Sequence, residues 1–421
     1  MIQALVSLSA LFFGLALLLV GLGLQGMLLP VRATIESFSA IEIGLMGTAY
    51  FAGFVVGCLR TSYLVRAVGH IRVFTALVVM VSAIPLLHSI AVNPVAWLAL
   101  RAVTGFCMAG VYMVIESWLN ERTSNEYRGG ILAFYTSLNL AAITAGQLLL
   151  PLYDPHRFEL FIIASILVSL AAVPVALSTG AAPAPVTRVS LRFMRIITQS
   201  PAGVAGCAAA GLVSGAFWTL APVFALQAGL SVTEVSLFMS VIVIGGAVGQ
   251  WPLGYISDRY DRRKVLLGTL VVACLLAVLM YLTARFQSGL LFLPAFFYGA
   301  TSFPIYAVAV SHVNDRIAAE DFVATSSGLL LAHGLMSAIG PLVGGLVMRL
   351  AGSASLFLFM AVALLVGAVF IYMRTRLPHV EAEEHAASYV PMTANLAAVS
   401  LDPRAEEEPD EPPLVDADTP I

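Results

Sequence analysis

The stretch GFCMAGVYMVIESWLNERTSNE, from Gly105 to Glu126, has a counterpart in GATSFPIYAVAVSHVNDRIAAE, from Gly299 to Glu320. The two stretches align without a gap at an offset of 194 residues. They share a glycine, a tyrosine, a serine and an asparagine, and in both the asparagine is followed by an acidic residue and an arginine. An ungapped alignment that also pairs these charges is not expected by chance, so the chain is predicted to contain two duplicated halves.

The composition around this repeat is that of a membrane protein. The chain has 421 residues, of which 60% are hydrophobic and 11% are charged, and its mean hydropathy is +0.94. Soluble domains are roughly 45–50% apolar and about 25% charged. This difference excludes an ordinary soluble enzyme and a soluble domain that is attached to the membrane by a single helix. Long unbroken apolar runs, in place of alternating segments, favour membrane helices over an outer-membrane barrel.

Twelve apolar runs have the length of a membrane-spanning helix, which needs about 20 residues. They cover residues 4–29, 41–59, 70–92, 94–118, 130–152, 158–178, 202–228, 232–256, 265–284, 288–312, 323–348 and 352–373. The predicted fold is all-α, with twelve transmembrane helices in two pseudo-symmetric six-helix bundles. The predicted domains are a first bundle at 1–178, a linker at 179–201, a second bundle at 202–375 and a tail at 376–421.

The distribution of charge predicts how the chain lies in the membrane. With the N-terminus inside, the inside segments hold fifteen Arg and Lys residues and the outside segments hold four. This bias follows the positive-inside rule, so both termini and the linker are predicted to be cytoplasmic, in a multi-pass protein of the plasma (inner) membrane. The tail carries 11 acidic residues against two arginines and is predicted to be disordered and solvated.

Three motifs resemble those of the major facilitator superfamily. GYISDRYDRRK at 254–264 is similar to the family's G-x-x-x-D-R-x-G-R-R loop, with Asp261 where the family usually has glycine. Arg101 to Gly105 resembles its R-x-x-x-G element, and Glu121 to Gly129 its E-x6-R-G loop. The stretch from Glu116 to Arg122, with Gly146-Gln147, looks most like the YcaD-type branch.

The resemblance implies a transporter whose halves rock around a central site. Its expected partners are a small-molecule substrate, the lipid bilayer and protons as the coupling ion. No cofactor, metal or nucleic acid is expected, and the protein is expected to be a monomer. In the family, charged clusters at the cytoplasmic ends of helices hold the two halves together. The residues here would be Asp258, Arg259, Arg262, Arg263, Glu121 and Arg128. The alternative is that these charges only mark the cytoplasmic side.

Arg101 is the most informative single residue. If the fourth span begins near Pro94, Arg101 lies about 10 Å deep, where a charge should face a cavity or a partner. On a helix it shares one face with Tyr112. It is therefore predicted to point into a central cavity and bind an anionic group. Alternatively, it hydrogen-bonds backbone carbonyls and polar groups of the first span near Gln25.

Other polar and aromatic residues are predicted to line the same cavity because polar groups at this depth face the bundle interior. They are Gln25, Tyr112, Gln147, Trp218, Gln250, Trp251, Tyr298 and Tyr306. The aromatic members could equally serve packing or the membrane interfaces. The candidate proton carriers are Glu116 and His333, although Glu116 could instead cap the inner charges and His333 could be a packing residue.

The stretch from Gly334 to Gly345 is rich in glycine and contains Pro341. Small residues permit close helix contact and proline permits a kink. We expect a tight packing hinge between the eighth and eleventh spans.

These features together predict a secondary transporter that works by alternating access and is coupled to protons. It would be either an exporter of amphiphilic compounds or a carrier of anionic metabolites. The alternative is a non-transporting receptor or scaffold that has kept the fold. An enzyme is not predicted, because the sequence offers no metal-ligand spacing, no Ser-His-Asp set and no phosphate-binding loop.

Overall fold

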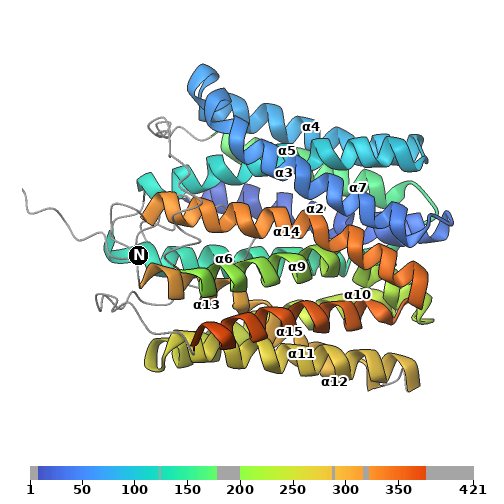
Figure 1. The fold of residues 1–421 in the computed structure, drawn as a ribbon. Coiled ribbons are helices and arrows are strands. Elements are labelled where there is room, and N and C mark those ends of the chain that lie inside the picture. The colour runs from blue at the N-terminus through green and yellow to red at the C-terminus, as the bar shows by residue number, and fades with distance from the viewer. Residues whose placement is uncertain (1–7, 123–124, 178–199, 287–289, 316–321, 376–421) are drawn as a thin grey trace, which may run out of the picture.

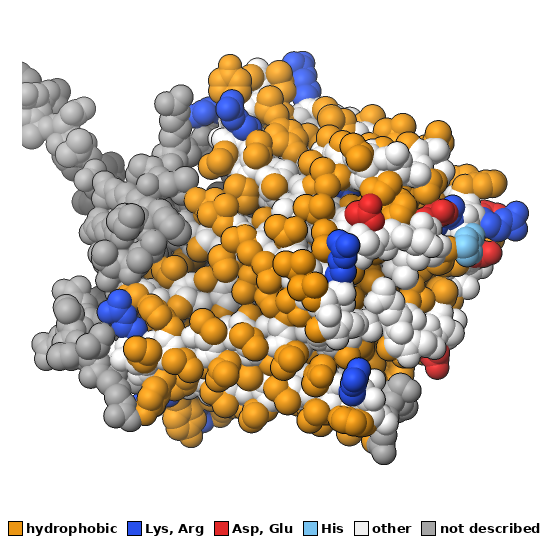
Figure 2. Space-filling view, turned by 45° about the vertical axis from the view of Figure 1, so that its right-hand side comes forward, with side chains coloured by type: hydrophobic (Ala, Val, Ile, Leu, Met, Phe, Trp, Pro, Cys, Tyr) orange, Lys and Arg blue, Asp and Glu red, His pale blue; other side chains and the backbone are white. Residues whose placement is uncertain are grey.

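The structure is a computed structural model that describes residues 8–122, 125–177, 200–286, 290–315 and 322–375. Its described part consists of helices that run side by side along one common direction, with no strand (Figure 1). Twelve segments of this part are long and apolar enough to cross a membrane, which confirms the predicted number of spans. On the face drawn in Figure 2, hydrophobic side chains predominate and charged ones are sparse.

The described helices fall into two sets in chain order. The first set contains α2 (Ser9–Ile35), α3 (Ala40–Val68), α4 (His70–Ile90), α5 (Pro94–Arg122), α6 (Asn125–Gln147), the short η1 (Leu150–Leu152) and α7 (Glu159–Ala176). The second set contains α9 (Pro201–Gln227), α10 (Val232–Arg259), α11 (Arg262–Phe286), α12 (Phe292–Ser302), α13 (Pro304–Asn314), α14 (Phe322–Ala351) and α15 (Ser355–Thr375). Helices α12 and α13 form one span, interrupted before Pro304 because proline has no backbone N–H to donate.

The two sets start their second helices in the same way. Ser39 caps α3 by accepting from the Glu42 backbone N–H, and Glu42 Oε2 accepts from the Ser39 N–H at 2.7 Å. Ser231 and Glu234 form the same capping box at the start of α10. Such boxes satisfy backbone donors that a helix start leaves unpaired. The repeat found in the sequence thus extends to the details of helix capping.

Among the described residues, the hydrophobic core that the two halves share lies at one end of the bundle. We call this the α2–α3 end, after the turn between those helices, and the opposite end the α10–α11 end. One buried cluster joins the second half to residues of the first half near the α2–α3 end, including Leu28, Ile43 and Trp97. The rest of the first half, from Leu8 to Leu19 and around Phe54, forms a separate cluster. The halves are therefore packed together most closely at the α2–α3 end.

Helices α3 and α14 make the closest contact between the halves, and in Figure 1 α14 lies between α3 and α9. A methyl group on Gly44 would overlap the carbonyl oxygen of Pro341, and one on Gly345 would overlap that of Ala40. Thr48 Oγ1 donates to the Ala338 carbonyl at 2.7 Å. The expected packing of the glycine-rich segment against the eighth span is wrong: the segment packs against α3 and α9.

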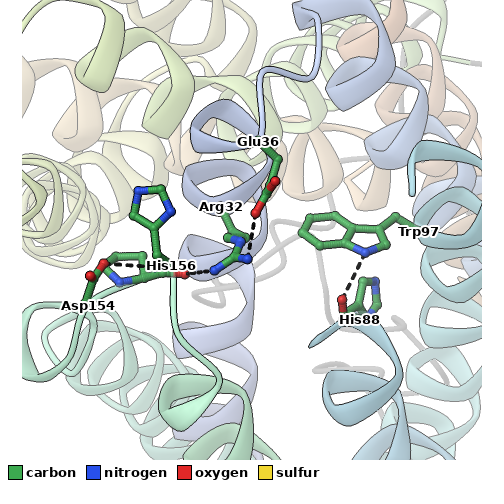
Figure 3. Close-up of polar contacts among 7 residues, drawn as sticks. Arg32, Glu36, His88, Trp97, Asp154 and His156 are labelled. Carbon is green, nitrogen blue, oxygen red and sulfur yellow. Dashed lines mark hydrogen bonds and ion pairs between the residues drawn. The ribbon is translucent and has the colours of Figure 1, made fainter. Parts of the chain in front are cut away.

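Polar contacts fix the loops at the α2–α3 end (Figure 3). Arg32 forms an ion pair with Glu36 at 2.6 Å and donates to the Pro155 carbonyl at 3.0 Å, which ties α2 to the segment before α7. The Trp97 indole donates to the His88 carbonyl at 3.1 Å, which ties α5 to α4. Nearly all of the predicted linker and the whole acidic tail lie outside the described residues, so their assignments remain predictions.

Candidate substrate-binding site between the two halves

Two adjoining pockets lie between the halves. The first, which we call the N-terminal pocket, is lined mainly by α2, α3, α5 and α6 and includes Arg101. The second, the C-terminal pocket, is lined mainly by α6, α9, α10, α12 and α13 and includes His333 of α14. Ile143 and Trp218 line both pockets, so the two meet at these side chains.

The position of Arg101 follows from its spacing to a glycine. Gly105, one helical turn further along α5, has no side chain, and a methyl group there would overlap the carbonyl oxygen of Tyr50. Gly53 of α3 meets the Ala102 carbonyl in the same way. This close approach places the Arg101 guanidinium carbon 4.3 Å from the centre of the Tyr50 ring, a cation–π contact. The R-x-x-x-G spacing therefore positions the arginine against an aromatic ring.

Three further residues predicted for the cavity line the N-terminal pocket. They are Gln25, Tyr112 and Gln147. The two polar side-chain atoms of Gln25 and Oε1 of Gln147 are buried without a hydrogen-bond partner among the described residues. The alternative in which Gln25 holds Arg101 is therefore not the arrangement adopted. These amide atoms remain available to a ligand or to water, as buried polar groups require.

The C-terminal pocket has an aromatic wall. The rings of Phe217, Trp218 and Phe303 lie 5.3–5.9 Å apart, centre to centre. The Tyr306 ring meets the His333 ring edge to face at 4.9 Å. Tyr298 also lines this pocket, and its hydroxyl lies 3.2 Å from the Met360 sulfur. Such a surface favours a planar apolar ligand.

Polar atoms interrupt this wall. The side-chain nitrogens of Asn139 and Gln250 and the hydroxyl of Tyr306 are buried without a hydrogen-bond partner in the described structure. All three residues line the C-terminal pocket. Because buried polar groups are almost always paired, these atoms indicate a site that is completed by water or a ligand.

His333 has one described side-chain contact within its own helix. Its Nδ1 lies 3.3 Å from the Ser337 hydroxyl, which also lies 3.1 Å from the Gly211 carbonyl. Its Nε2 is buried and has no described partner. A neutral imidazole carries one donor and one acceptor nitrogen, so His333 brings a titratable group to the lining of the C-terminal pocket.

Two other predicted residues lie outside both linings. Glu116 is buried but is not among the described residues of either pocket. Trp251 was predicted to line the cavity, and this prediction is wrong. Its side chain is 79% exposed on the outside of α10 and stacks on Tyr255. Neighbouring residues on a helix point about 100° apart, so Gln250 faces the pocket while Trp251 faces away.

The predicted gate residues that the structure describes lie at the α10–α11 end. Arg262, with 7% of its side chain exposed, pairs with Asp258 at 3.0 Å and with Asp315 of the α13 end at 2.9 Å. Arg263 is also buried, whereas Arg259 is exposed and lies over the Tyr255 ring. These described pairs join elements of the second half. The side chains of Glu121 and Arg128 lie outside the described residues.

Asp261, the departure from the family motif, has a local role. Its side chain accepts from the Arg263 backbone N–H at 2.9 Å, and its carbonyl accepts from Lys264 and Val265. It therefore caps the start of α11, as aspartate commonly does.

A comparison with known families agrees with this arrangement. The sequence profile of the Major Facilitator Superfamily matches residues 11–194 and 203–405. The chain belongs to the Major Facilitator Superfamily. Its function is therefore that of a membrane transporter, and its substrate has to be inferred from the site.

Curated relatives point to one branch of the superfamily. The chain is 27% identical to an uncharacterized MFS-type transporter YcaD of Escherichia fergusonii over 350 residues, covering 83% of this chain and 90% of the relative. It is 28% identical over 359 residues to the protein of the same name in Shigella flexneri, with the same coverage. The YcaD-type resemblance seen in the motifs is thus confirmed at the level of the whole chain.

Solved structures of the superfamily share the fold. The nucleoside transporter NupG aligns with a TM-score of 0.71 at 12% identity, covering 88% of this chain and 99% of that one. A bacterial homolog of the human lysosomal transporter Spinster, in an inward-facing and occupied conformation, aligns with a TM-score of 0.72 at 16% identity. That alignment covers 88% of this chain and 97% of the other.

Sequence reasoning missed several residues of the pockets. Tyr50, Asn139 and Phe303 line them but were not singled out. Asn139 carried a usable signal, because a polar side chain near the middle of a span usually faces the bundle interior. Tyr50 and Phe303 carried none, since aromatic residues are common throughout membrane helices.

Proposed function

We propose that this protein is a secondary active transporter that moves a small organic solute across the plasma (inner) membrane by alternating access. The observation that carries this proposal is the convergence of polar and aromatic side chains from both halves on two adjoining pockets. Arg101 and Gln147 come from the first half, and Gln250 and Tyr306 from the second. A site at the interface of two such halves can be exposed to either side when the halves rock.

The conformation and the orientation together define one state of this cycle. By the positive-inside rule, the α10–α11 end, with its arginines, and both termini are cytoplasmic. The α2–α3 end, where the halves share a core and α3 packs on α14, is then on the outer side. The packing of the halves at this end and the proposed orientation support the interpretation that this conformation is inward-facing.

Protons are the proposed coupling ion, and His333 is the better-placed carrier. His333 lines the C-terminal pocket, so its protonation can respond to a bound solute. Glu116 is buried outside both linings and is the second candidate. Replacing the carrier with glutamine, as His333→Gln or Glu116→Gln, should abolish uphill transport but preserve solute exchange. If both variants keep full uphill transport, the assignment is contradicted.

The rocking motion can be tested by measuring distances between paired spin labels in nanodiscs. Labels on the exposed residues Ser37 and Gln227 report the outer end, and labels on Arg66 and Tyr260 report the inner end. We expect two populations in which one pair is close while the other is apart. A non-transporting receptor or scaffold is the alternative function. It predicts one unchanging set of distances at every pH and with every solute tested.

A further inference from the structure

Arg101 places a positive charge at the wall of the N-terminal pocket. Arg101 is the one residue with a fixed charge among the described residues that line the two pockets, and neither lining contains an aspartate or glutamate. Within the described part of the chain, the contact found for the Arg101 guanidinium is the Tyr50 ring, and none of the ion pairs involves Arg101. A partly buried cation without a carboxylate partner favours an anionic ligand and disfavours a cationic one.

Both pockets hold buried polar atoms without a described partner. In the N-terminal pocket these are the amide nitrogen of Gln25, which is a donor, and the side-chain oxygens of Gln25 and Gln147, which are acceptors. In the C-terminal pocket, Asn139 and Gln250 offer amide nitrogens and Tyr306 offers a hydroxyl. Acceptor oxygens of a ligand would satisfy the donors among these groups.

The remaining wall suits a planar ring. Trp218 lines both pockets, so a ligand held at Arg101 can extend past it into the space beside Phe303 and Tyr306. His333 also lines the C-terminal pocket, and its imidazole can accept a hydrogen bond from a ring N–H or hydroxyl. Arg101 thus favours an anionic group at one end of a ligand, and the aromatic wall favours a ring at the other end.

From this arrangement we infer that the substrate is an aromatic organic anion, with its carboxylate at Arg101 and its ring in the C-terminal pocket. This inference rests on the proposed transport function and narrows it. It favours an anionic substrate over a neutral or cationic amphiphilic one. The direction of transport is not part of the inference.

Three ligands that share one ring and differ in charge provide the test. Indole-3-acetate is an anion, indole-3-acetamide is neutral and tryptamine is a cation. Their binding to the full-length protein in nanodiscs is measured by calorimetry and by the shift in unfolding temperature. A second series, 3-phenylpropanoate with its amide and its amine, removes the dependence on one ring. We expect each carboxylate to bind roughly tenfold or more tightly than its amide, and the amines not to bind.

Variants assign the charge selectivity to one residue. Arg101→Gln should weaken carboxylate binding by roughly ten- to a hundredfold and leave amide binding unchanged. Arg101→Lys keeps the charge but loses the planar fork, so binding should fall to an intermediate value. Arg285→Gln is the matched control, because Arg285 is exposed at the end of α11, away from both pockets. The unfolding temperature without ligand shows whether each variant is folded.

The inference is overturned if none of the carboxylates binds, if amides or amines bind as tightly, or if Arg101→Gln leaves carboxylate binding unchanged. These results are independent of the proposed function, because the spin-label distances test alternating access without a substrate. A protein that rocks but selects amines would remain a transporter with a different substrate class.

Discussion

At the scale of single residues, the position of Arg101 depends on a glycine in its own helix. Gly105 allows α5 to meet α3 at Tyr50, and that contact sets Arg101 against the Tyr50 ring. The motif predicted an arginine at the cavity with a glycine one helical turn away, because their spacing on a helix is fixed. It could not predict Tyr50, because the partner across a close contact is set by tertiary packing.

This dependence makes Gly105 a sensitive position. Gly105→Val should destabilise the protein by about 1–3 kcal/mol, since the added methyl groups overlap the α3 backbone and force the helices apart. The unfolding temperature in detergent measures this change. The control is Gly26→Val, because no atom lies within 4 Å of a methyl group added at Gly26. Equal effects of the two substitutions would show that the contact at Gly105 is not tight.

Arg262 connects the ends of two helices. It pairs with both Asp258 and Asp315, so Arg262→Gln should leave two carboxylates without this partner and lower stability by about 1–3 kcal/mol. The neighbouring Arg259→Gln is the matched control, because Arg259 is exposed and exposed charge contacts contribute little. Chemical unfolding of both variants compares the two arginines. A larger loss from Arg259→Gln would contradict the structure.

At the scale of helices, the sequence predicts the elements better than their partners. Apolar length and capping residues are local properties, so the twelve spans agree closely with the helices found. The glycines around Pro341 correctly indicated close packing. Their partner was predicted wrongly as the eighth span, because a stripe of small residues fits any helix with a complementary surface. The actual partners, α3 and α9, are fixed by the whole bundle.

The contact between α3 and α14 should therefore control the outer end. Gly345→Leu places a side chain against the Ala40 carbonyl and should disfavour the closed outer end. Overpacking typically costs about 1–3 kcal/mol, so the ratio of closed to open molecules should fall by roughly five- to a hundredfold. The Ser37–Gln227 spin-label distance measures this shift. Gly268→Leu is the control, because a methyl group there meets nothing within 4 Å.

At the scale of the whole molecule, duplication explains why so much of the architecture was predictable. The two halves repeat a helix pattern, a capping box and an acid–base pair at the end of the fourth span of each half, so each half supports the interpretation of the other. What duplication cannot predict is the difference between the pockets. The first half contributes a cation and the second an aromatic wall, because the sequences diverged where they face the cavity.

Orientation is the remaining property of the whole molecule, and it decides which state the structure represents. If the arginine-rich α10–α11 end is cytoplasmic, Tyr153→Cys should react with a membrane-impermeant maleimide in intact cells. Tyr260→Cys should react only after the membrane is opened. Both side chains are at least half exposed and lie at opposite ends of the bundle, so each is a matched control for the other. The four native cysteines lie within the membrane-spanning helices, and wild-type protein measures their background.

The reverse labelling pattern would show that the protein has the opposite orientation in the membrane. The closed end would then face the cytoplasm, and the same coordinates would describe an outward-facing transporter.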